Sequence, residues 1–191
     1  GTFVGLEQAG AGSIRLGTQE TTAYELFAMD VNGRVEYKPQ VWRYTATSST
    51  QDRANNALKL TTAEFMGFSA SLMKGFGEKA PTATQTDFTS FGAKYNGGNL
   101  QAALVKDSLS GTAASYKFPG LVYEGVPGTI TAGTALSYSS AGTIRRTIAG
   151  VSYDMGVAKF NYIMANSAGS TDGVLNTNTV GVRIPYEKMA V

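Results

Sequence analysis

The feature that most limits how this chain can fold is a regular alternation of apolar and polar residues in short runs. Toward the C-terminal end, for example, Val180, Val182 and Ile184 alternate with Thr179 and Arg183. Successive side chains of a strand point to opposite faces, so this period of two predicts strands with one apolar face and one face of mixed polarity. Runs of this kind predict nine strands, at residues 2–7, 13–18, 57–61, 67–75, 90–95, 100–105, 146–153, 158–164 and 179–184.

The connections between these runs alternate between short and long. The short ones are residues 8–12, 62–66, 96–98, 154–156 and the chain from 186 onward, and the long ones are residues 19–55, 77–86, 107–143 and 165–176. Tight turns at one end and long loops at the other are typical of an up-and-down barrel in an outer membrane. We therefore expect an all-β fold, a transmembrane antiparallel up-and-down β-barrel.

Composition excludes several classes of function. The 16 basic and 14 acidic residues nearly balance, which argues against binding to nucleic acid. The sequence has no Cys and no His, which removes thiolate and imidazole metal sites and Ser-His-Asp catalysis. We therefore expect no catalytic residue, no metal and no cofactor, and we predict that the protein is not an enzyme.

The mixed-polarity face of the predicted strands carries six basic residues: Arg15, Lys59, Lys94, Arg146, Lys159 and Arg183. The opposite face carries small or medium apolar residues between aromatic residues such as Phe68, Tyr95 and Phe160. In a membrane barrel the apolar face meets lipid, so we expect the six basic residues to line the pore. Lys74 is expected on the apolar side, where its charge would snorkel at the rim.

Several short motifs add a family resemblance. They are Asn-Asn-Ala-Leu-Lys-Leu-Thr at residues 55–61, Phe-Met-Gly-Phe at 65–68, Val-Ser-Tyr-Asp-Met-Gly-Val-Ala-Lys at 151–159, and a hairpin formed by residues 3–6 and 13–17. In this order and spacing they resemble the general diffusion porins of Gram-negative bacteria, especially the proteobacterial type with sixteen strands and a trimeric assembly. The resemblance extends over nearly the whole chain and is weakest at residues 107–143.

The resemblance implies an integral outer-membrane porin through which ions and small hydrophilic solutes diffuse passively. It implies a homotrimer in contact with outer-membrane lipids and lipopolysaccharide, with no nucleic-acid partner. We expect residues 1–191 to be one partial porin domain, a fragment that lacks the first three and last four of sixteen strands. Two departures stand out: Thr18 occupies a position where the family commonly has Arg, and the chain ends at Val191 without a terminal aromatic residue.

The resemblance also implies that residues 19–55 are the constriction loop, which folds into the barrel and narrows the pore. The loop charges expected to act there are Glu20, Glu25, Asp30, Arg34, Glu36, Lys38 and Arg43. We expect Arg15 and Lys59 to be the wall cations at the constriction, facing Asp30 and Glu36. Because the strand interiors offer no clear acidic match for the six wall cations, a mild anion preference is expected. The alternative for each loop charge is an ordinary solvated side chain.

Other functions remain as alternatives. An outer-membrane barrel adhesin would place its function in residues 107–143, a barrel enzyme would need a nucleophile and a base, and a soluble β-sandwich binding domain would leave the alternating connections unexplained. Ser71 and Lys74 have the Ser-x-x-Lys spacing of penicillin-binding enzymes, but alternation places them on opposite faces of a strand. The cluster Trp42-Arg43-Tyr44 either stacks on sugar rings or packs the loop against the wall.

Overall fold

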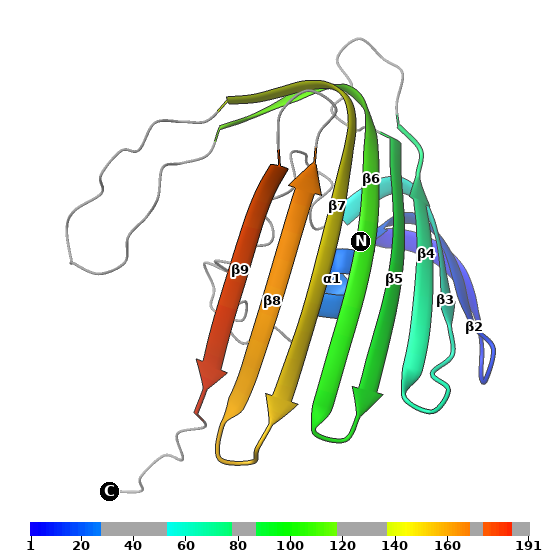
Figure 1. The fold of residues 1–191 in the computed structure, drawn as a ribbon. Coiled ribbons are helices and arrows are strands. Elements are labelled where there is room, and N and C mark those ends of the chain that lie inside the picture. The colour runs from blue at the N-terminus through cyan, green and yellow to red at the C-terminus, as the bar shows by residue number, and fades with distance from the viewer. Residues whose placement is uncertain (28–52, 78–86, 118–136, 169–173, 185–191) are drawn as a thin grey trace, which may run out of the picture.

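The computed structural model describes residues 1–27, 53–77, 87–117, 137–168 and 174–184, which form one antiparallel sheet and one short helix. The elements are β1 (Thr2–Gln8), β2 (Gly12–Glu20), α1 (Thr22–Leu26), β3 (Arg53–Thr62), β4 (Phe68–Gly75), β5 (Asp87–Gly97), β6 (Leu100–Lys117), β7 (Ser137–Asp154), β8 (Lys159–Ala168) and β9 (Val174–Arg183). Each strand pairs with the next one along the chain, in the order β1 to β9 (Figure 1). The nine predicted strands are thus confirmed, as is their up-and-down order.

Four tight turns join the strands at one end of the sheet, the lower end in Figure 1. They follow β1, β3, β5 and β7, as the short connections predicted. Each uses glycine or a residue with positive φ where the chain reverses, for example Gly98 at φ 58° and Gly156 at φ 82°. Such backbone angles suit glycine, which has no Cβ to clash. Within the described ranges, no helix is long and apolar enough to cross a membrane.

Some strand limits differ from the prediction. The chain between Asp107 and Thr143 was expected to be a loop, yet β6 continues to Lys117 and β7 begins at Ser137. The residues just after Asp107 are mostly Ser, Gly, Thr and Ala, so their sequence shows no apolar period although their backbones pair. Likewise β8 reaches Ala168 and β9 begins at Val174, which shortens the expected connection at 165–176.

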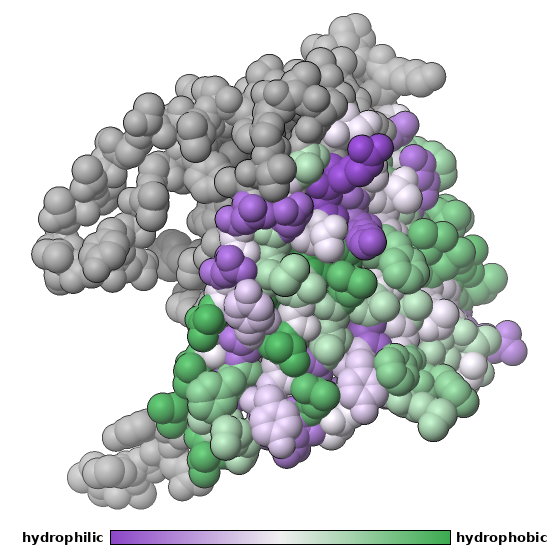
Figure 2. All heavy atoms as spheres, viewed as in Figure 1, coloured by the Kyte–Doolittle hydropathy of each residue, from purple (hydrophilic) through white to green (hydrophobic). Residues whose placement is uncertain are grey.

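The two faces of the sheet differ in polarity. We call the face against which α1 packs the inner face, and the opposite one the outer face. On the inner face Lys59 and Arg146 are 1% and 2% exposed, whereas on the outer face Leu72, Phe91 and Tyr153 are nearly half exposed. A soluble sandwich buries its apolar face and exposes its charges, so this sheet has the opposite arrangement. Figure 2 shows the outer face, with apolar and aromatic side chains over its lower part and hydrophilic ones nearer the long connections.

The helix α1 supplies most of the packing on the inner face. Thr21 caps it by accepting a hydrogen bond from the backbone N–H of Tyr24 at 3.2 Å. Ala23 and Phe27 then join a buried cluster with strand residues of β6, β7 and β8, which include Val105, Ile148, Ile163, Ala103 and Ala165. A second buried cluster lies beside it on β3 to β6 and consists of Ala54, Ala57, Met73, Phe88 and Leu109. The first cluster therefore lies between α1 and the sheet, whereas the second is made of strand residues alone.

Candidate functional site on the inner face

The six basic residues predicted to line a pore all lie at inner-face positions of the strands. Their register brings some of them side by side, because Arg15 is the strand partner of Lys59, and Lys159 is the strand partner of Arg183. The strand partner of Lys94 is Ser69, and that of Arg146 is Asp107. The inner face therefore carries one pair of cations near β1, another near β9, and single cations between them.

Lys59 is tied to the chain that leads into α1. Its Nζ lies 2.6 Å from Oε2 of Glu25 and donates a hydrogen bond to the backbone carbonyl of Glu20 at 3.0 Å. Its side chain is 1% exposed. The positive charge of Lys59 is therefore shielded from solvent and paired with a carboxylate, so this residue acts mainly as an anchor for α1.

Gln19 reinforces this anchor, although no motif in the sequence marks it as a functional residue. Its buried amide Nε2 donates to the backbone carbonyl of Ala57 at 2.9 Å and to that of Arg15 at 3.2 Å. These bonds lie at the irregularity between Gly17 and Gln19, where the pairing of β2 with β3 shifts its register and then continues to Glu20. Arg15, Gly17 and Gln19 alternate along β2 and therefore point to the same inner face. This alternation is the feature of the sequence that could have placed the Gln19 side chain there.

Two inner-face glycines make room for α1. A Cβ atom on Gly92 would collide with Thr22 and lie 2.6 Å from Cδ1 of Leu26. A Cβ atom on Gly150 would lie 2.8 Å from Cε1 of Phe27. Both distances are too short for real Cβ contacts, so a side chain at either position would force the side chains of Thr22, Leu26 or Phe27 to shift.

Asp107 and Arg146 form a buried ion pair on the inner wall. Nε of Arg146 donates to Oδ2 of Asp107 at 2.8 Å, and Nη2 of the same guanidinium donates to the same oxygen. The two residues are 4% and 2% exposed. The expectation that the strands offer no acidic match is therefore wrong, because Asp107 was assigned to a loop whereas it lies within β6.

The positive charges of the remaining inner-face cations are less fully balanced by nearby carboxylates. Arg15 lies 3.9 Å from Glu7, but the two side chains are 35% and 76% exposed and the distance is long, so this pair contributes little. Within the described ranges no salt bridge involves Lys94, Lys159 or Arg183. Lys159 contacts Oε1 of the Gln101 side chain at 3.4 Å. Near the short-turn end of β5, β8 and β9 the inner face thus carries Lys94, Lys159 and Arg183 against one carboxylate in register, that of Asp154, the strand partner of Lys159.

Several predicted residues lie outside the described part of the chain: Asp30, Arg34, Glu36, Lys38, Trp42, Arg43 and Tyr44. Glu20 and Glu25 are described, and both contact Lys59 as above. Ser71 is buried on the inner face while Lys74 points to the outer face, so they do not form a catalytic pair. Among the described residues, no group of three acidic side chains gathers in a way that would hold a metal ion.

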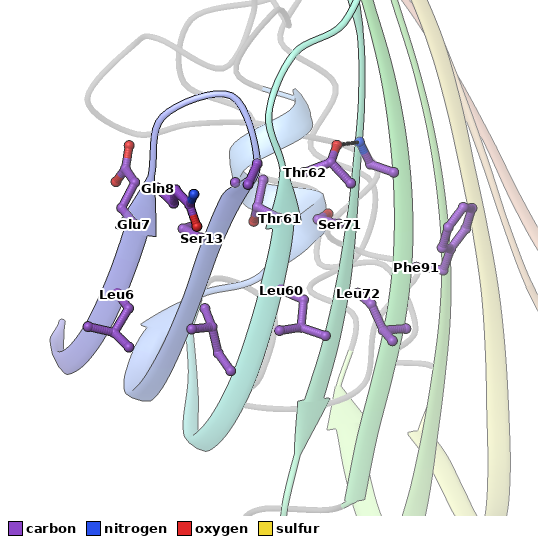
Figure 3. Close-up of a pocket in the computed structure, with 14 residues that line it drawn as sticks. Leu6, Glu7, Gln8, Ser13, Leu60, Thr61, Thr62, Ser71, Leu72 and Phe91 are labelled. Atoms are coloured by element: carbon purple, nitrogen blue, oxygen red, sulfur yellow. Dashed lines mark hydrogen bonds between the residues drawn. The ribbon is translucent and has the colours of Figure 1, made fainter.

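A hollow in the sheet is lined by a row of apolar residues and, beside them, by polar residues that include Glu7. Leu6, Leu60, Leu72 and Phe91 cross β1, β3, β4 and β5 in one row, which Ile14 of β2 completes (Figure 3). Leu6, Leu72 and Phe91 are among the exposed hydrophobic residues of the outer face. The apolar row of this hollow therefore belongs to the outer face, and its lining holds no cation.

Comparison with known proteins identifies one sequence family and several solved structures with a similar fold. The sequence model of a family described as Gram-negative porin matches residues 1–190, whereas no curated protein sequence matches the chain. The anion-selective porin from Comamonas acidovorans is 21% identical at a TM-score of 0.61, over 96% of this chain and 52% of that one. OmpT of Vibrio cholerae, expressed in the outer membrane, is 15% identical at a TM-score of 0.64, over 94% and 51%.

A third solved structure extends this likeness. The Salmonella typhi OmpF complex with daunomycin is 14% identical at a TM-score of 0.53, over 98% of this chain and 66% of that one. At these identities the structures establish a shared fold. The chain spans about half the length of the first two structures it matches.

Proposed function

Because this chain belongs to the Gram-negative porin family, we propose that it forms part of the wall of a water-filled channel for passive diffusion of ions and small hydrophilic solutes. As a member of that family it is an integral protein of the outer membrane. The observation that carries the proposal is the inverted polarity of the sheet, with buried charges inside and half-exposed apolar side chains outside. Diffusion through such a channel needs no catalytic residue and no cofactor.

The proposed constriction is the segment between Gln19 and Asn55. Its support is the way the segment enters the inner face: α1 packs on β4, β5 and β6, and Lys59 and Gln19 hold the chain on either side of the bend. A segment fixed to the wall in this way narrows the space enclosed by the sheet. The proposed loop charges are Glu20, Glu25, Asp30, Arg34, Glu36, Lys38 and Arg43, of which Glu25 already serves Lys59.

A mild anion preference is proposed for the channel. Six cations are proposed to line the pore: Arg15, Lys59, Lys94, Arg146, Lys159 and Arg183. They differ in how much each contributes to the electric field in the pore. Lys59 and Arg146 face carboxylates at close range, so the net field in the pore comes mainly from Lys94, Lys159, Arg183 and Arg15. The anion selectivity named for the porin of Comamonas acidovorans supports the same sign.

A homotrimer, embedded in outer-membrane lipid and lipopolysaccharide, is proposed as the assembly. The support is the family to which the chain belongs, together with an outer face that exposes Val4, Leu16, Leu72 and Val180. Exposed apolar side chains of this number need either lipid or a neighbouring subunit.

The experiment that tests the channel is the current through the purified full-length protein in a planar bilayer under a salt gradient. Stepwise ohmic conductance with a reversal potential directed toward anions is the expected result. Conductance with cation preference would support the channel but contradict the proposal that the wall cations set its ion preference. A folded barrel that carries no current would overturn the channel and favour an adhesin or a barrel enzyme.

A further inference from the structure

Two cations of the inner face are direct strand partners at the short-turn end of the sheet. Lys159 begins β8 and Arg183 ends β9, and the register of the two strands places them opposite each other (Figure 1). The Cβ atoms of direct partners lie about 4.5–5.5 Å apart, and like charges placed in this way repel each other. Arg15 and Lys59 form another such pair, but Glu25 lies 2.6 Å from the Lys59 ammonium. No salt bridge of the described residues balances Lys159 or Arg183, so their proximity needs a reason.

One carboxylate lies in register with this pair, that of Asp154, the strand partner of Lys159. The residue is exposed, and its Oδ1 accepts a hydrogen bond from the backbone N–H of Gly156 at 2.8 Å, within the turn between β7 and β8. Among the residues that the structure describes, it forms no salt bridge with Lys159. Asp154 therefore lowers the positive potential of the pair without cancelling it, because two cations stand against one acid.

The Lys159 side chain extends across β7 toward β6. Its Nζ lies 3.4 Å from Oε1 of Gln101, and Nε2 of Gln101 donates to Oδ1 of Asn96 at 3.2 Å. Ser152 of β7 is the strand partner of Gln101, and its hydroxyl is buried without a hydrogen-bond partner in the described part of the chain. An ammonium group can donate three hydrogen bonds and a guanidinium five. Apart from the contact with Gln101, the donors of Lys159, Arg183 and Ser152 find no acceptor in the described ranges.

We propose that Lys159 and Arg183 form a clamp that binds the oxyanion group, a carboxylate or a phosphate, of a small solute at the short-turn mouth of the channel. A guanidinium matches two oxygens of such a group, and the ammonium supplies a point charge from the neighbouring strand. The Ser152 hydroxyl, two residues from the end of β7, is a further donor. A bound oxyanion supplies the acceptors that this end of the wall lacks and offsets the repulsion between the two cations.

This inference rests on the proposed function and goes beyond it. Fixed charges on a pore wall favour anions of every kind and do not saturate. A clamp binds one class of anion saturably and prefers it to chloride, which cannot receive two parallel hydrogen bonds on separate oxygens. Such a site delays the permeant anion, since an ion must leave a binding site before the next one passes.

The test is the block of the chloride current through the full-length protein in a planar bilayer. Potassium acetate and inorganic phosphate are the two probes, each added to potassium chloride at constant ionic strength. In the unchanged protein both should reduce the current with a saturating dependence on concentration. Lys159→Gln combined with Arg183→Gln should raise the half-blocking concentration about tenfold or more, since both charge-assisted contacts are lost. The chloride current that remains in this variant shows that the barrel has folded.

Two further variants sharpen the test. Arg15→Gln with Lys94→Gln removes the same charge from the inner face at a distance from the clamp, and should leave the half-blocking concentration nearly unchanged. Asp154→Asn keeps a side-chain oxygen that can accept from Gly156 but removes the carboxylate. It should lower the half-blocking concentration about threefold, because an opposing charge near the oxyanion is lost.

Three results would overturn the clamp. They are a current that falls only in proportion to the added oxyanion, an equal weakening of block in both double variants, and normal block in the variant that lacks Lys159 and Arg183. Block by only one of the two probes would support the clamp and identify its ligand as that oxyanion.

Binding is also measured without current, from the broadening of the phosphorus NMR line of inorganic phosphate by the protein in micelles of a neutral detergent. A folded barrel that broadens this line through Lys159 and Arg183 but carries no current would support the clamp and contradict the channel. A barrel that conducts, yet neither broadens the line nor shows saturable block by either probe, would contradict the clamp alone.

Discussion

Lys59 and Glu25 meet on the inner face of the sheet, where Nζ of the lysine lies 2.6 Å from a carboxylate oxygen of the glutamate. The same Nζ donates to the backbone carbonyl of Glu20, so one side chain holds both ends of the turn that leads from β2 into α1. Lys59 was predicted from strand parity to face the pore, and its contacts also give it a structural role. It fixes the first part of the proposed constriction to the wall.

Replacing Lys59 with Met should loosen α1. Hydrogen bonds that involve a charged group contribute about 1.5–3 kcal/mol each, which corresponds to about ten- to a hundredfold more frequent opening. The measurement is the labelling rate of a single cysteine at Ala23, which is fully buried in a sequence without native cysteine. We expect faster labelling and noisier single-channel current, with little change in ion selectivity.

Lys59→Arg is the matched control, because an arginine keeps the charge and the capacity to donate to both partners. Its labelling rate should stay close to that of the unchanged protein. Slow labelling in Lys59→Met would show that α1 is held by its apolar packing alone.

Gly92→Val should displace α1 without removing any charge. A Cβ atom at this position collides with the side chains of Thr22 and Leu26, so these side chains, the helix or the strand must shift, and the bulk of valine makes a shift of the helix the expected outcome. Faster labelling at Ala23→Cys is again the expected result, together with altered conductance. The control is Ala93→Val, the next residue on β5, whose side chain points to the outer face. If both valine variants behave alike, the close contact between Gly92 and α1 is not what positions the helix.

Much of this arrangement follows from residue parity, which depends only on the alternation of side chains along a strand. Parity places Arg15, Lys94, Lys159 and Arg183 on one face, and the structure has them there. The turns follow from glycine and from short polar connections. The nine strands and their order were therefore predictable from the sequence.

Contacts between distant segments were not predictable in the same way. The role of Lys59 depends on where the chain after Glu20 bends, and no period in the sequence encodes that bend. The sequence around Gly92 and Gly150 gives no sign that Thr22, Leu26 and Phe27 pack closely against these two glycines. The position of Asp107 within a strand could not be predicted, because the apolar alternation ends near it although the pairing of β6 with β7 continues to Lys117.

Asp107→Leu should destabilise the barrel. Removing one partner of a buried ion pair leaves the other charge uncompensated, at a cost of about 3–5 kcal/mol. Unfolding of the full-length protein by urea, followed by circular dichroism in detergent micelles, measures the change. The double variant Asp107→Leu and Arg146→Met should recover most of the stability, since replacing both partners by apolar residues is often nearly neutral. A loss below about 1 kcal/mol in the single variant would contradict the burial of this pair.

Ion selectivity should respond to Lys94 and Lys159 more than to Lys59. The first two have no salt bridge within the described ranges, so we expect their charges to act on ions in the proposed pore, whereas the charge of Lys59 is paired with Glu25. Lys94→Glu combined with Lys159→Glu should move the reversal potential toward cations, most clearly at low salt, because at about 0.1 M the screening length is only about 10 Å. The control is Lys74→Glu with Lys106→Glu, which makes the same change in charge on the outer face. In a bilayer of neutral lipid its reversal potential should stay at that of the unchanged protein. An equal shift in both double variants would mean that selectivity reflects net charge rather than the inner wall.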